Sequence, residues 1–481
     1  MLPVLTPEEM AAVDAAAPEP VEVLIGRAGA AVARRALALL GGGYGRRVTV
    51  VCGKGNNGND GRAAAGLLAR RGVLTRVIEA ADAPRRLDRC DLVIDAAYGT
   101  GFRGSYRAPD AAGAPVLAVD IPSGVDGVTG EASGAPAAAH GTVTFAALKP
   151  GLLFHPGRAL VGEVSVADIG LDPSRATAGL VTAADVAAWA PRRPPDTHKW
   201  RAAVMVAGGS PGMTGAAHLA ASAALRAGAG MVHVASPGLD DHPGLPVEAI
   251  GVATPAAGWH STVLGRLDRA GALVVGPGLG RSTAGEAAVR RVVAEAAVPT
   301  VVDGDGLSAL GADVAEVLAG RPQPASVVLT PHDGEFARLA GAAPGADRCA
   351  AARDLAARSG AVVLLKGPTT VVAEPGGLVR LVTAGDERLA TAGTGDVLSG
   401  IVAALLARGA DPFDAAAAGA WLHGVAARGG PAEGLVASDV VAGLPGALAA
   451  ARAGAVGDGG DAGARPGAAA DGDAGGGGRG R

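Results

Sequence analysis

Aromatic residues make up only 2% of this 481-residue chain, and no stretch of it is apolar enough to suggest a membrane span. A membrane-spanning helix needs about 18–20 predominantly apolar residues, so we expect none. Basic residues are also sparse: 42 lysines and arginines face 46 acidic residues, which gives a net charge of −4, and they form no dense block. Proteins that bind nucleic acid or anionic membranes usually concentrate positive charge. We therefore expect no nucleic-acid partner and no membrane partner.

Cysteine is the next scarce residue type. Cys52, Cys90 and Cys349 are too few and too widely spaced for a disulfide framework or a zinc site. We expect them to be small buried side chains. The N-terminal sequence MLPVLTPEEM lacks a basic region followed by an apolar run, so it does not resemble a signal peptide. These absences predict a cytoplasmic protein.

Small apolar residues and glycine dominate what is present. Apolar residues make up 49% of the chain, much of it alanine and valine, and there are 77 glycines. Small side chains suit helices that pack closely on sheets, and many of the glycines follow strand-like runs, where the chain must turn sharply into a helix. The composition therefore favours an α/β protein.

Strand-like and helix-like segments alternate in two series. Residues 1–43 are predicted to be helical, with Thr6 as an N-cap. Such alternation predicts parallel sheets with helices on both faces. The expected strands are 47–52, 73–78, 92–95 and 116–121 in the first series and 202–207, 230–235, 272–275, 299–303, 326–330 and 361–366 in the second, which closes with helices at 394–408 and 412–427.

The length of the chain favours two or three domains. The Pro-rich segment 190–197 (APRRPPDT) cannot continue a helix, so we expect a linker there. It would separate a first domain at 1–189 from a second at 198–452. The Gly- and Ala-rich remainder, 453–481, has too little apolar surface to offset its ordering entropy and is predicted to be disordered.

Three strand ends in the first half carry polar groups. The loop VVCGKGNNGNDG (50–61) follows a strand and precedes a helix, so its backbone N–H groups can approach an anion closely. DLVIDAAYGTGFRG (91–104) and VLAVDIPSGVDGVTG (116–130) place Asp95, Asp120 and Ser123 after two further strands. Ligands of parallel sheets bind beyond the carboxyl ends of the strands, where these segments would meet. The simpler alternative is that the loop makes a tight turn and each Asp caps a turn.

These motifs, together with TFAALKPGL (144–152), resemble the NAD(P)H-hydrate epimerase family, whose fold is a Rossmann-like three-layer sandwich. The resemblance covers residues 1–175 and implies that Asp120 is the acid/base and that potassium is ligated by Asn57, Asp95 and Ser123. Where the family reads GNNGGDG this chain has Asn59, which would place a bulkier side chain beside the phosphate. The residues implied to line the site of the hydrated nucleotide are Asn56, Asn57, Gly58, Asn59, Asp60, Gly99, Thr100, Gly101, Phe102, Arg103, Gly104, Ser105 and Asp120.

The strongest pattern in the second half is ATAGTGDVLSGIVAALLARG (390–409). Its apolar residues recur with a helical period, so a helix is predicted to begin near Thr394. The free N–H groups of Gly393, Thr394 and Gly395, together with the helix dipole, would attract a phosphate. Asp396 in the first turn could then take a proton from a substrate hydroxyl. The alternative role of Asp396 is to cap the helix.

The GTGD turn resembles the ribokinase-like superfamily of α/β proteins. With the motifs THKWRAAVMVAGGSPGMTGAA, VVGPGLG, VVDGDGLSAL, VLTPHDGEFARL and VLLKGPTTVV, in that order, residues 190–450 resemble the ADP/ATP-dependent NAD(P)H-hydrate dehydratases. The resemblance implies that magnesium counters the charge on the transferred phosphoryl group. Contacts to the hydrated nicotinamide nucleotide are implied for Ala216, Gly278, His332 and Asp396, and contacts to ADP for Lys366, Gly367, Pro368, Thr369, Thr370 and Gly395.

The two resemblances together imply a bifunctional repair enzyme, which we expect to be a homo-oligomer. The first half would interconvert the R and S hydrates of NADH and NADPH. The second would dehydrate the S hydrate at the expense of ADP, releasing AMP and phosphate. Two alternatives remain at this stage: a ribokinase-like kinase that phosphorylates a vitamin-precursor alcohol to a stable product, and a first half that binds nucleotides without catalysis. The sequence also leaves open whether ADP or ATP is the phosphoryl donor.

Overall fold

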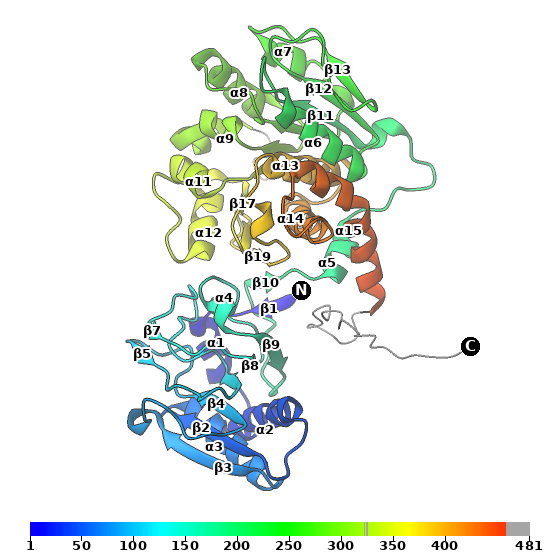
Figure 1. Cartoon of the computed structure of the whole chain (residues 1–481). Helices are drawn as coiled ribbons and strands as arrows, with labels where there is room; N and C mark the ends of the chain where they lie inside the picture. Colours follow the sequence, from blue (N-terminus) through cyan, green and yellow to red (C-terminus); the bar gives the residue numbers. More distant parts are fainter. Residues whose placement is uncertain (322, 324–325, 458–481) are drawn as a thin grey trace, which may run out of the picture.

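The computed structural model of the chain describes residues 1–321, 323 and 326–457. It contains two large sheets, one in each half of the chain (Figure 1). The first has six strands and the second eleven, so the predicted α/β class is confirmed. The predicted disorder of residues 458–481 lies outside the described residues.

The sheet of the first half is entirely parallel and has the strand order β3-β2-β4-β6-β8-β9. Thr6 caps α1 as predicted, and Glu9 completes its capping box. The elements of this half are β1 (Leu2–Val4), α1 (Pro7–Ala15), α2 (Val21–Leu40), β2 (Arg47–Cys52), α3 (Asn56–Ala69), β3 (Leu74–Glu79), η1 (Ala80–Asp82), β4 (Leu92–Ala96), β5 (Tyr106–Arg107), β6 (Val116–Val119), β7 (Gly134–Ala135), β8 (Gly141–Phe145), η2 (Pro150–Leu152), α4 (Gly157–Leu160), β9 (Glu163–Ala167), β10 (Ala178–Leu180) and α5 (Ala183–Trp189).

The two faces of this first sheet are covered differently. Helices α2 and α3 pack on one face, against Val50, Ile94 and Leu117 among others. On the opposite face, buried Val51 and Val93 pack against irregular segments, because the connections on either side of β6 contain no α-helix. Pro and Gly recur in these connections and break helices. The prediction of helices on both faces is therefore wrong for the second face of this sheet.

The sheet of the second half has the order β1-β10-β19-β18-β17-β16-β15-β14-β11-β12-β13. From β13 to β17 neighbouring strands are parallel, whereas β18 is antiparallel to both of its neighbours. The elements are η3 (Lys199–Ala202), β11 (Ala203–Ala207), α6 (Thr214–Arg226), β12 (Met231–Ala235), β13 (Ala249–Val252), α7 (Trp259–Leu264), η4 (Leu267–Arg269), β14 (Ala272–Val275), α8 (Thr283–Glu295), β15 (Thr300–Val302), α9 (Asp305–Leu310), η5 (Gly311–Asp313), α10 (Val314–Ala319), β16 (Val327–Leu329), α11 (Asp333–Ala340), α12 (Arg348–Ser359), β17 (Val362–Leu365), β18 (Thr370–Ala373), β19 (Val379–Val382), η7 (Glu387–Leu389), α13 (Thr394–Ala407), α14 (Pro412–Arg428) and α15 (Ala437–Gly457).

Helices cover both faces of this larger sheet, as predicted. Alternate strand residues such as Val204 and Val274 pack against α5, α6, α13, α14 and α15 on one face. Their neighbours, such as Met205 and Val275, pack against α7 to α12 on the other. The strands are buried on both faces, which explains their continuous apolar runs of valine, leucine and alanine.

The predicted domain boundary needs two corrections. Residues 190–197 carry neither helix nor strand. However, β10 pairs with β19, and β1 pairs with β10, so these two strands of the first half extend the sheet of the second (Figure 1). Helix α5 also packs in the core of the second half. At the other end, α15 continues to Gly457, so residues 453–457, which we expected to be disordered, are helical.

Two expectations drawn from scarce residues can be compared with the structure. Cys52 and Cys349 are buried and Cys90 is half-buried, and none of them forms a disulfide. Among the described residues, no helix combines the length and apolar character needed to cross a membrane.

Candidate active sites

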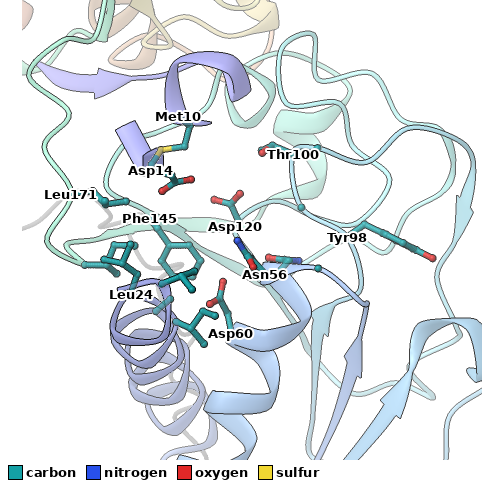
Figure 2. A pocket seen from close by; sticks show the side chains of 18 of the residues that line it. Met10, Asp14, Leu24, Asn56, Asp60, Tyr98, Thr100, Asp120, Phe145 and Leu171 are labelled. Atoms are coloured by element: carbon teal, nitrogen blue, oxygen red, sulfur yellow. The ribbon is translucent and has the colours of Figure 1, made fainter. Parts of the chain in front are cut away.

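A cavity of about 590 Å³ opens at the carboxyl end of the first sheet. Figure 2 shows the side chains of Asp14, Asp60 and Asp120 turned toward a common space, with Phe145 and Leu24 beside them. The three carboxyl groups come from α1, from α3 and from the end of β6. The strand ends that we expected to meet therefore do so, and the helix α1 closes the cavity over them.

The start of α3 forms one wall of this cavity. Its N-cap is Gly55, which has no side chain to cap the helix, so the first N–H groups remain free near Asn56 and Asn57. Gly58 lies on the inner side of the helix, where an added Cβ would come within 1.9 Å of the carbonyl oxygen of Gly53. Gly58 is thus needed for the close approach of the helix to its own loop.

Asp120 is held in an unusual backbone conformation next to a buried cation. Its φ of +67° is rare for a residue with a side chain. Oδ1 of Asp120 lies 2.6 Å from Nζ of Lys149 and accepts a hydrogen bond of 3.0 Å from Oγ1 of Thr144. The Lys149 side chain is only 1% exposed, and Nζ also donates to the carbonyl oxygen of Phe145. The geometry therefore directs a paired carboxylate into the cavity.

Two further carboxyl groups of the cavity, those of Asp60 and Asp14, have raised pKa values. Burial, with further contributions from Asp120 and Asp14, raises the pKa of Asp60 to about 8. Burial and Asp120 also raise the pKa of Asp14. A carboxyl group with a pKa near 8 is mostly protonated at neutral pH and can donate a proton or a hydrogen bond. The cavity thus combines a paired carboxylate with a neutral carboxylic acid.

The predicted potassium ligands lie next to this cavity. Oγ of Ser123 lies 2.7 Å from Oδ1 of Asp95, and the backbone N–H of Ser123 donates to Oδ2. Burial raises the pKa of Asp95. Asn57 lies against Gly99, and both polar atoms of its side chain are buried without a hydrogen-bond partner. A cation would satisfy the buried amide oxygen of Asn57, and this is the observation that bears on the predicted potassium site.

Not all residues predicted for the first site line the cavity. Asn56, Asn57, Asp60, Asp120 and the segment 99–102 do. Asn59, which we expected beside the phosphate, does not: its Oδ1 faces the Arg62 guanidinium at 3.5 Å. Arg103 is largely exposed and faces Asp126 at 4.0 Å. The predicted residues that do not line the cavity are Gly58, Asn59, Arg103, Gly104 and Ser105.

Sequence reasoning missed several residues of this cavity, of which Lys149 and Asp14 are the most important. Lys149 lies in the quoted motif TFAALKPGL, but only the fold shows that its ammonium group is buried against Asp120. Asp14 lies on a helix remote in sequence from all four motifs. The other missed lining residues are Met10, Glu19, Val21, Leu24, Ile25, Ala28, Gly55, Ala97, Tyr98, Phe145, Ile169 and Leu171.

The second site is built around the N-terminus of α13, which begins at Thr394 as predicted. Gly393 has a φ of +90°, and a Cβ there would come within 2.6 Å of the Leu219 side chain. No side chain caps this helix. The N–H of Thr394, which we expected to be free, donates to the carbonyl oxygen of Thr391 at 3.4 Å, whereas those of Gly393 and Gly395 have no partner among the described hydrogen bonds and can bind an anion. Asp396 lies in the first turn and does not act as the cap. The capping alternative for Asp396 is therefore wrong.

An ion pair between half-buried Lys366 and buried Asp303 lies against this helix start. Nζ of Lys366 lies 2.9 Å from Oδ1 of Asp303; Oδ1 also accepts a hydrogen bond from Thr330, and Oδ2 accepts one from Ser399. Although burial alone would raise it, Lys366 holds the pKa of Asp303 below its ordinary range. A Cβ on Gly395 would lie 3.4 Å from Nζ of Lys366, so the ammonium group closely approaches the helix N-terminus.

Asp396 titrates close to neutral pH in this setting. Burial raises its pKa to about 7; Asp303, Asp305 and Glu335 act in the same direction, and Lys366 opposes them. A group with a pKa near the working pH is well suited to general base catalysis. The helix start therefore combines an anion-binding end, a half-buried lysine and a carboxylate that can accept a proton.

The remaining predicted contacts are placed as follows. Gly278 has a φ of +65°, and a Cβ there would lie 3.2 Å from that of Ala216, so these two residues are neighbours. His332 is the N-cap of α11, and its Nδ1 accepts hydrogen bonds from the backbone N–H groups of Gly334 and Glu335. Its side chain is 58% exposed, and its Nε2 lies 3.6 Å from Oε1 of the buried Glu335. Capping by His332 was not anticipated.

The segment Lys366–Thr370, predicted to hold ADP, connects β17 to the first residue of β18. Lys366 faces Asp303, as described above. Gly367 lies against the Arg348 guanidinium, and the Thr369 side chain is buried. Sequence reasoning missed Asp303 and Glu335, although both stand inside quoted motifs. Nζ of Lys366 lies 2.9 Å from Asp303 and 3.7 Å from Glu335. These contacts arise because β15, β16 and β17, which precede the three residues in the chain, are neighbours in the sheet.

Each half of the chain matches a known protein family. A family model described as NAD(P)H-hydrate dehydratase matches residues 204–444, and one described as the YjeF-related protein N-terminus matches residues 21–89 and 74–151. A curated bifunctional NAD(P)H-hydrate repair enzyme from Moorella thermoacetica is 39% identical over 441 residues, which is 79% of this chain and 82% of that protein.

Two solved structures are also similar to this chain. A ribokinase-like superfamily protein from Enterococcus faecalis, 23% identical, matches 57% of this chain and 96% of its own with a TM-score of 0.51, which shows a shared fold. An ADP/ATP-dependent NAD(P)H-hydrate dehydratase from Bacillus subtilis, co-crystallised with ATP and Mg²⁺, is 30% identical and covers 56% of this chain and 97% of its own with a TM-score of 0.47. On the length and identity of the curated match, the chain belongs to the family of bifunctional NAD(P)H-hydrate repair enzymes.

Proposed function

We propose that this chain restores hydrated NADH and NADPH in two steps. The first half interconverts the R and S hydrates, and the second half dehydrates the S hydrate at the expense of ADP. The observation that carries the proposal is the placement of Asp396 in the first turn of α13, beside the Lys366–Asp303 ion pair. In the same chain, the first half holds a separate cavity with its own acid and base groups.

The chemistry of the second half follows from that placement. The Asp396 carboxylate accepts the proton of the ring hydroxyl of the S hydrate, and the hydroxyl oxygen attacks the terminal phosphorus of ADP. The phosphorus–oxygen bond to AMP breaks, and AMP leaves. The ring phosphate ester then eliminates phosphate together with a ring proton, which restores the double bond. The free N–H groups at the start of α13 and the Lys366 ammonium stabilise the negative charge on the phosphoryl group.

The same half also supplies the contacts for both nucleotides. We propose that the segment Lys366–Thr370 and Gly395 hold ADP, and that Ala216, Gly278 and His332 hold the hydrated nicotinamide nucleotide. Among the described residues, no group of three or more His, Cys, Asp or Glu side chains could hold a metal ion. Magnesium usually keeps waters and binds through nucleotide phosphates and one or two carboxylates. Magnesium therefore fits as a companion of ADP, and it supplies positive charge at the phosphoryl group.

In the first half, we propose that Asp120 is the acid/base group for epimerisation. The hydroxyl-bearing ring carbon of the hydrate is bonded to the ring nitrogen, so loss of water gives a planar cation that water can attack from either face. Neutral Asp60 can donate a proton to the departing hydroxyl, and the Asp120 carboxylate can accept one from the incoming water. Two carboxyl groups with different protonation suit such an exchange. The segment Gly99–Phe102 and Asn56 would contact the nucleotide.

We further propose that a potassium ion binds at Asn57, Asp95 and Ser123. Buried oxygen atoms of an amide, a carboxylate and a hydroxyl are hard donors of the kind that alkali cations prefer. The ion would supply positive charge for the phosphate of the nucleotide at the start of α3. Cytoplasmic localisation and assembly into a homo-oligomer are part of the same proposal.

The function can be tested with separated R and S hydrates of NADH, in the presence of Mg²⁺, K⁺ and either ADP or ATP. Recovery of NADH is followed by its absorbance, and the nucleotide products by chromatography. We expect wild type to convert both hydrates with ADP and to form AMP. Asp120→Asn should still convert the S hydrate while the R hydrate reacts only at the spontaneous epimerisation rate. A stable phosphorylated product, or no recovery of NADH from the S hydrate with either nucleotide, would overturn the proposal.

A further inference from the structure

The segment that follows Lys149 in the first half reaches the proposed ADP-holding segment of the second half. Oγ1 of Thr369 donates a hydrogen bond of 2.5 Å to the carbonyl oxygen of Leu153, and the Thr369 side chain is only 2% exposed. Leu153 follows the short helix η2 and belongs to the first half. The middle of the ADP-holding segment is therefore anchored to the other half of the chain.

Arg158 makes a second connection at the same place. It lies on α4, which Figure 1 shows next to β10 and β19. One terminal nitrogen of its guanidinium donates to the carbonyl oxygen of Pro368 at 3.1 Å, and the other to that of Thr383 at 3.0 Å. Thr383 opens the segment that leads to the GTGD turn. Arg158 thus bridges the two segments that approach the N-terminus of α13 from β17 and from β19.

The segment just before Arg158 packs in a buried apolar core. Leu152, Leu153 and Phe154 are buried in the same apolar core as Leu365 and Val371, the strand residues that flank the ADP-holding segment. Ile121, next to Asp120, belongs to that core as well. Close-packed side chains in such a core leave little freedom of movement. The segment that leads into α4 is therefore held by packing, which brings Arg158 on α4 within reach of Pro368 and Thr383.

The two carbonyl contacts are not equivalent. Thr383 also accepts a hydrogen bond of 3.1 Å from Arg428 on α14, so its carbonyl group keeps a donor if Arg158 is removed. The carbonyl group of Pro368 accepts only from Arg158 among the described contacts. Pro368 lies two residues after Lys366, whose ammonium group approaches Gly395. Loss of Arg158 therefore acts mainly on the ADP-holding segment.

We propose that Arg158, a residue of the epimerase-like half, is a positioning residue for the ADP-holding segment Lys366–Thr370 of the dehydratase half. This inference rests on the proposed function of that segment. Arg158 contacts neither substrate nor nucleotide in this role. It holds the backbone of Pro368 in the conformation that presents Lys366 to the phosphates at the start of α13. The ADP-holding segment of the dehydratase half is then positioned in part by the epimerase-like half.

Arg158→Gln removes the charge and one of the two donors, and Arg158→Lys keeps the charge. Because Arg158 acts on ADP only through the backbone of Pro368, we expect the KM for ADP of Arg158→Gln to rise on the order of tenfold while kcat changes less than about twofold. Arg158→Lys should lie between this variant and wild type. The affinity of the full-length chain for ADP, measured by calorimetry, should fall by the same factor.

Arg353→Gln is the matched control. Arg353 on α12 also makes two such bonds, to the carbonyl oxygen of Gly377 and to Oγ1 of Thr177, but touches neither segment of the bridge. It should lower the unfolding temperature about as much as Arg158→Gln and leave the KM for ADP unchanged. Equal KM values for the two variants would refute the positioning role. Loss of ADP-dependent turnover in wild type would instead refute the proposed function, and the calorimetric comparison would still decide the role of Arg158.

Discussion

The substitution Asp396→Asn keeps the size of the side chain and removes the proposed base of the second site. General base catalysis typically contributes about 10²–10⁴-fold to a rate, so we expect kcat for the S hydrate to fall by about that factor. The KM for ADP should change little, because the free N–H groups of the helix start and Lys366 remain. Both hydrates should lose turnover, because the R hydrate must pass through the S form.

The pKa of Asp396 fixes the pH dependence of the wild-type reaction. Burial, with the neighbouring carboxylates, raises this pKa to about 7, and the base must be ionised to accept a proton. With that pKa, about half of the groups are ionised at pH 7 and about a tenth at pH 6. The rate constant kcat/KM for the S hydrate should therefore rise about tenfold per pH unit below pH 7 and level off above about pH 8.

The same pKa makes the folded state less stable as the pH rises. Between the ordinary value of 3.8 and about 7, the folded chain retains a proton that the unfolded chain has released, so the free energy of unfolding falls with rising pH across this window. The full shift corresponds to about 4 kcal/mol, and we expect solvent access to the site to leave about 1–2 kcal/mol of it. Asp396→Asn removes this cost. At pH 8 the variant should be more stable than wild type, and at pH 4 the two should be equal.

Two measurements check this reasoning. Initial rates of NADH recovery from the S hydrate between pH 5.5 and 9 give the profile, and thermal unfolding at pH 4 and pH 8 gives the stability difference. A rate profile that is flat between about pH 6 and pH 8 would contradict an Asp396 pKa near 7. A variant that keeps more than about a tenth of the wild-type kcat would exclude Asp396 as the base.

Further predictions concern the first half. Lys149→Met leaves the Asp120 carboxylate without its cation and should lower the free energy of unfolding in urea by about 2–4 kcal/mol, part of which Asp120→Asn should restore if the pair is formed. Gly58→Ala should lower the free energy of unfolding by about 2–4 kcal/mol because its Cβ would collide with a backbone oxygen. Gly66→Ala on the same helix, where a Cβ meets no atom within 4 Å, should raise the free energy of unfolding by about 0.5–1 kcal/mol. Similar effects of the two substitutions would argue against the close packing at Gly58. Asp60→Asn should slow epimerisation and raise the unfolding temperature by about 2–4 °C at pH 9 but not at pH 4. The reason is that the raised pKa of Asp60 makes the folded state less stable as pH rises from about 4 to 8. An effect on the unfolding temperature that does not depend on pH would contradict the raised pKa of Asp60.

Patterns confined to a short stretch of sequence predicted local structure well. The helix at 394–408 and its start near Thr394 follow from apolar spacing and a glycine turn, and the structure confirms both. Strand β2 has the predicted bounds, and β4 extends one residue further. Strands such as β8, β18 and β19 were not predicted. They were missed because their alternating or short apolar runs carry a weak periodic signal.

The predicted sites show the same division. Asp120 and Asp396 were found because each follows a strand or opens a helix within a recognisable motif. Lys149 was missed although it lies in a quoted motif, because nothing local distinguishes a buried lysine from an exposed one. His332 was predicted to contact the substrate, and its capping of α11 became visible only in the backbone geometry.

The sequence by itself determined the α/β class, the order of the motifs and the residues that end each strand with a polar group. These depend on apolar periodicity and turn chemistry, which act over a few residues. Only the tertiary structure decided that β1 and β10 extend the second sheet, that Lys149 pairs with Asp120, and that Arg158 reaches Pro368. Each of these depends on which distant segments pack together, and that choice is made by the burial of apolar surface over the whole chain.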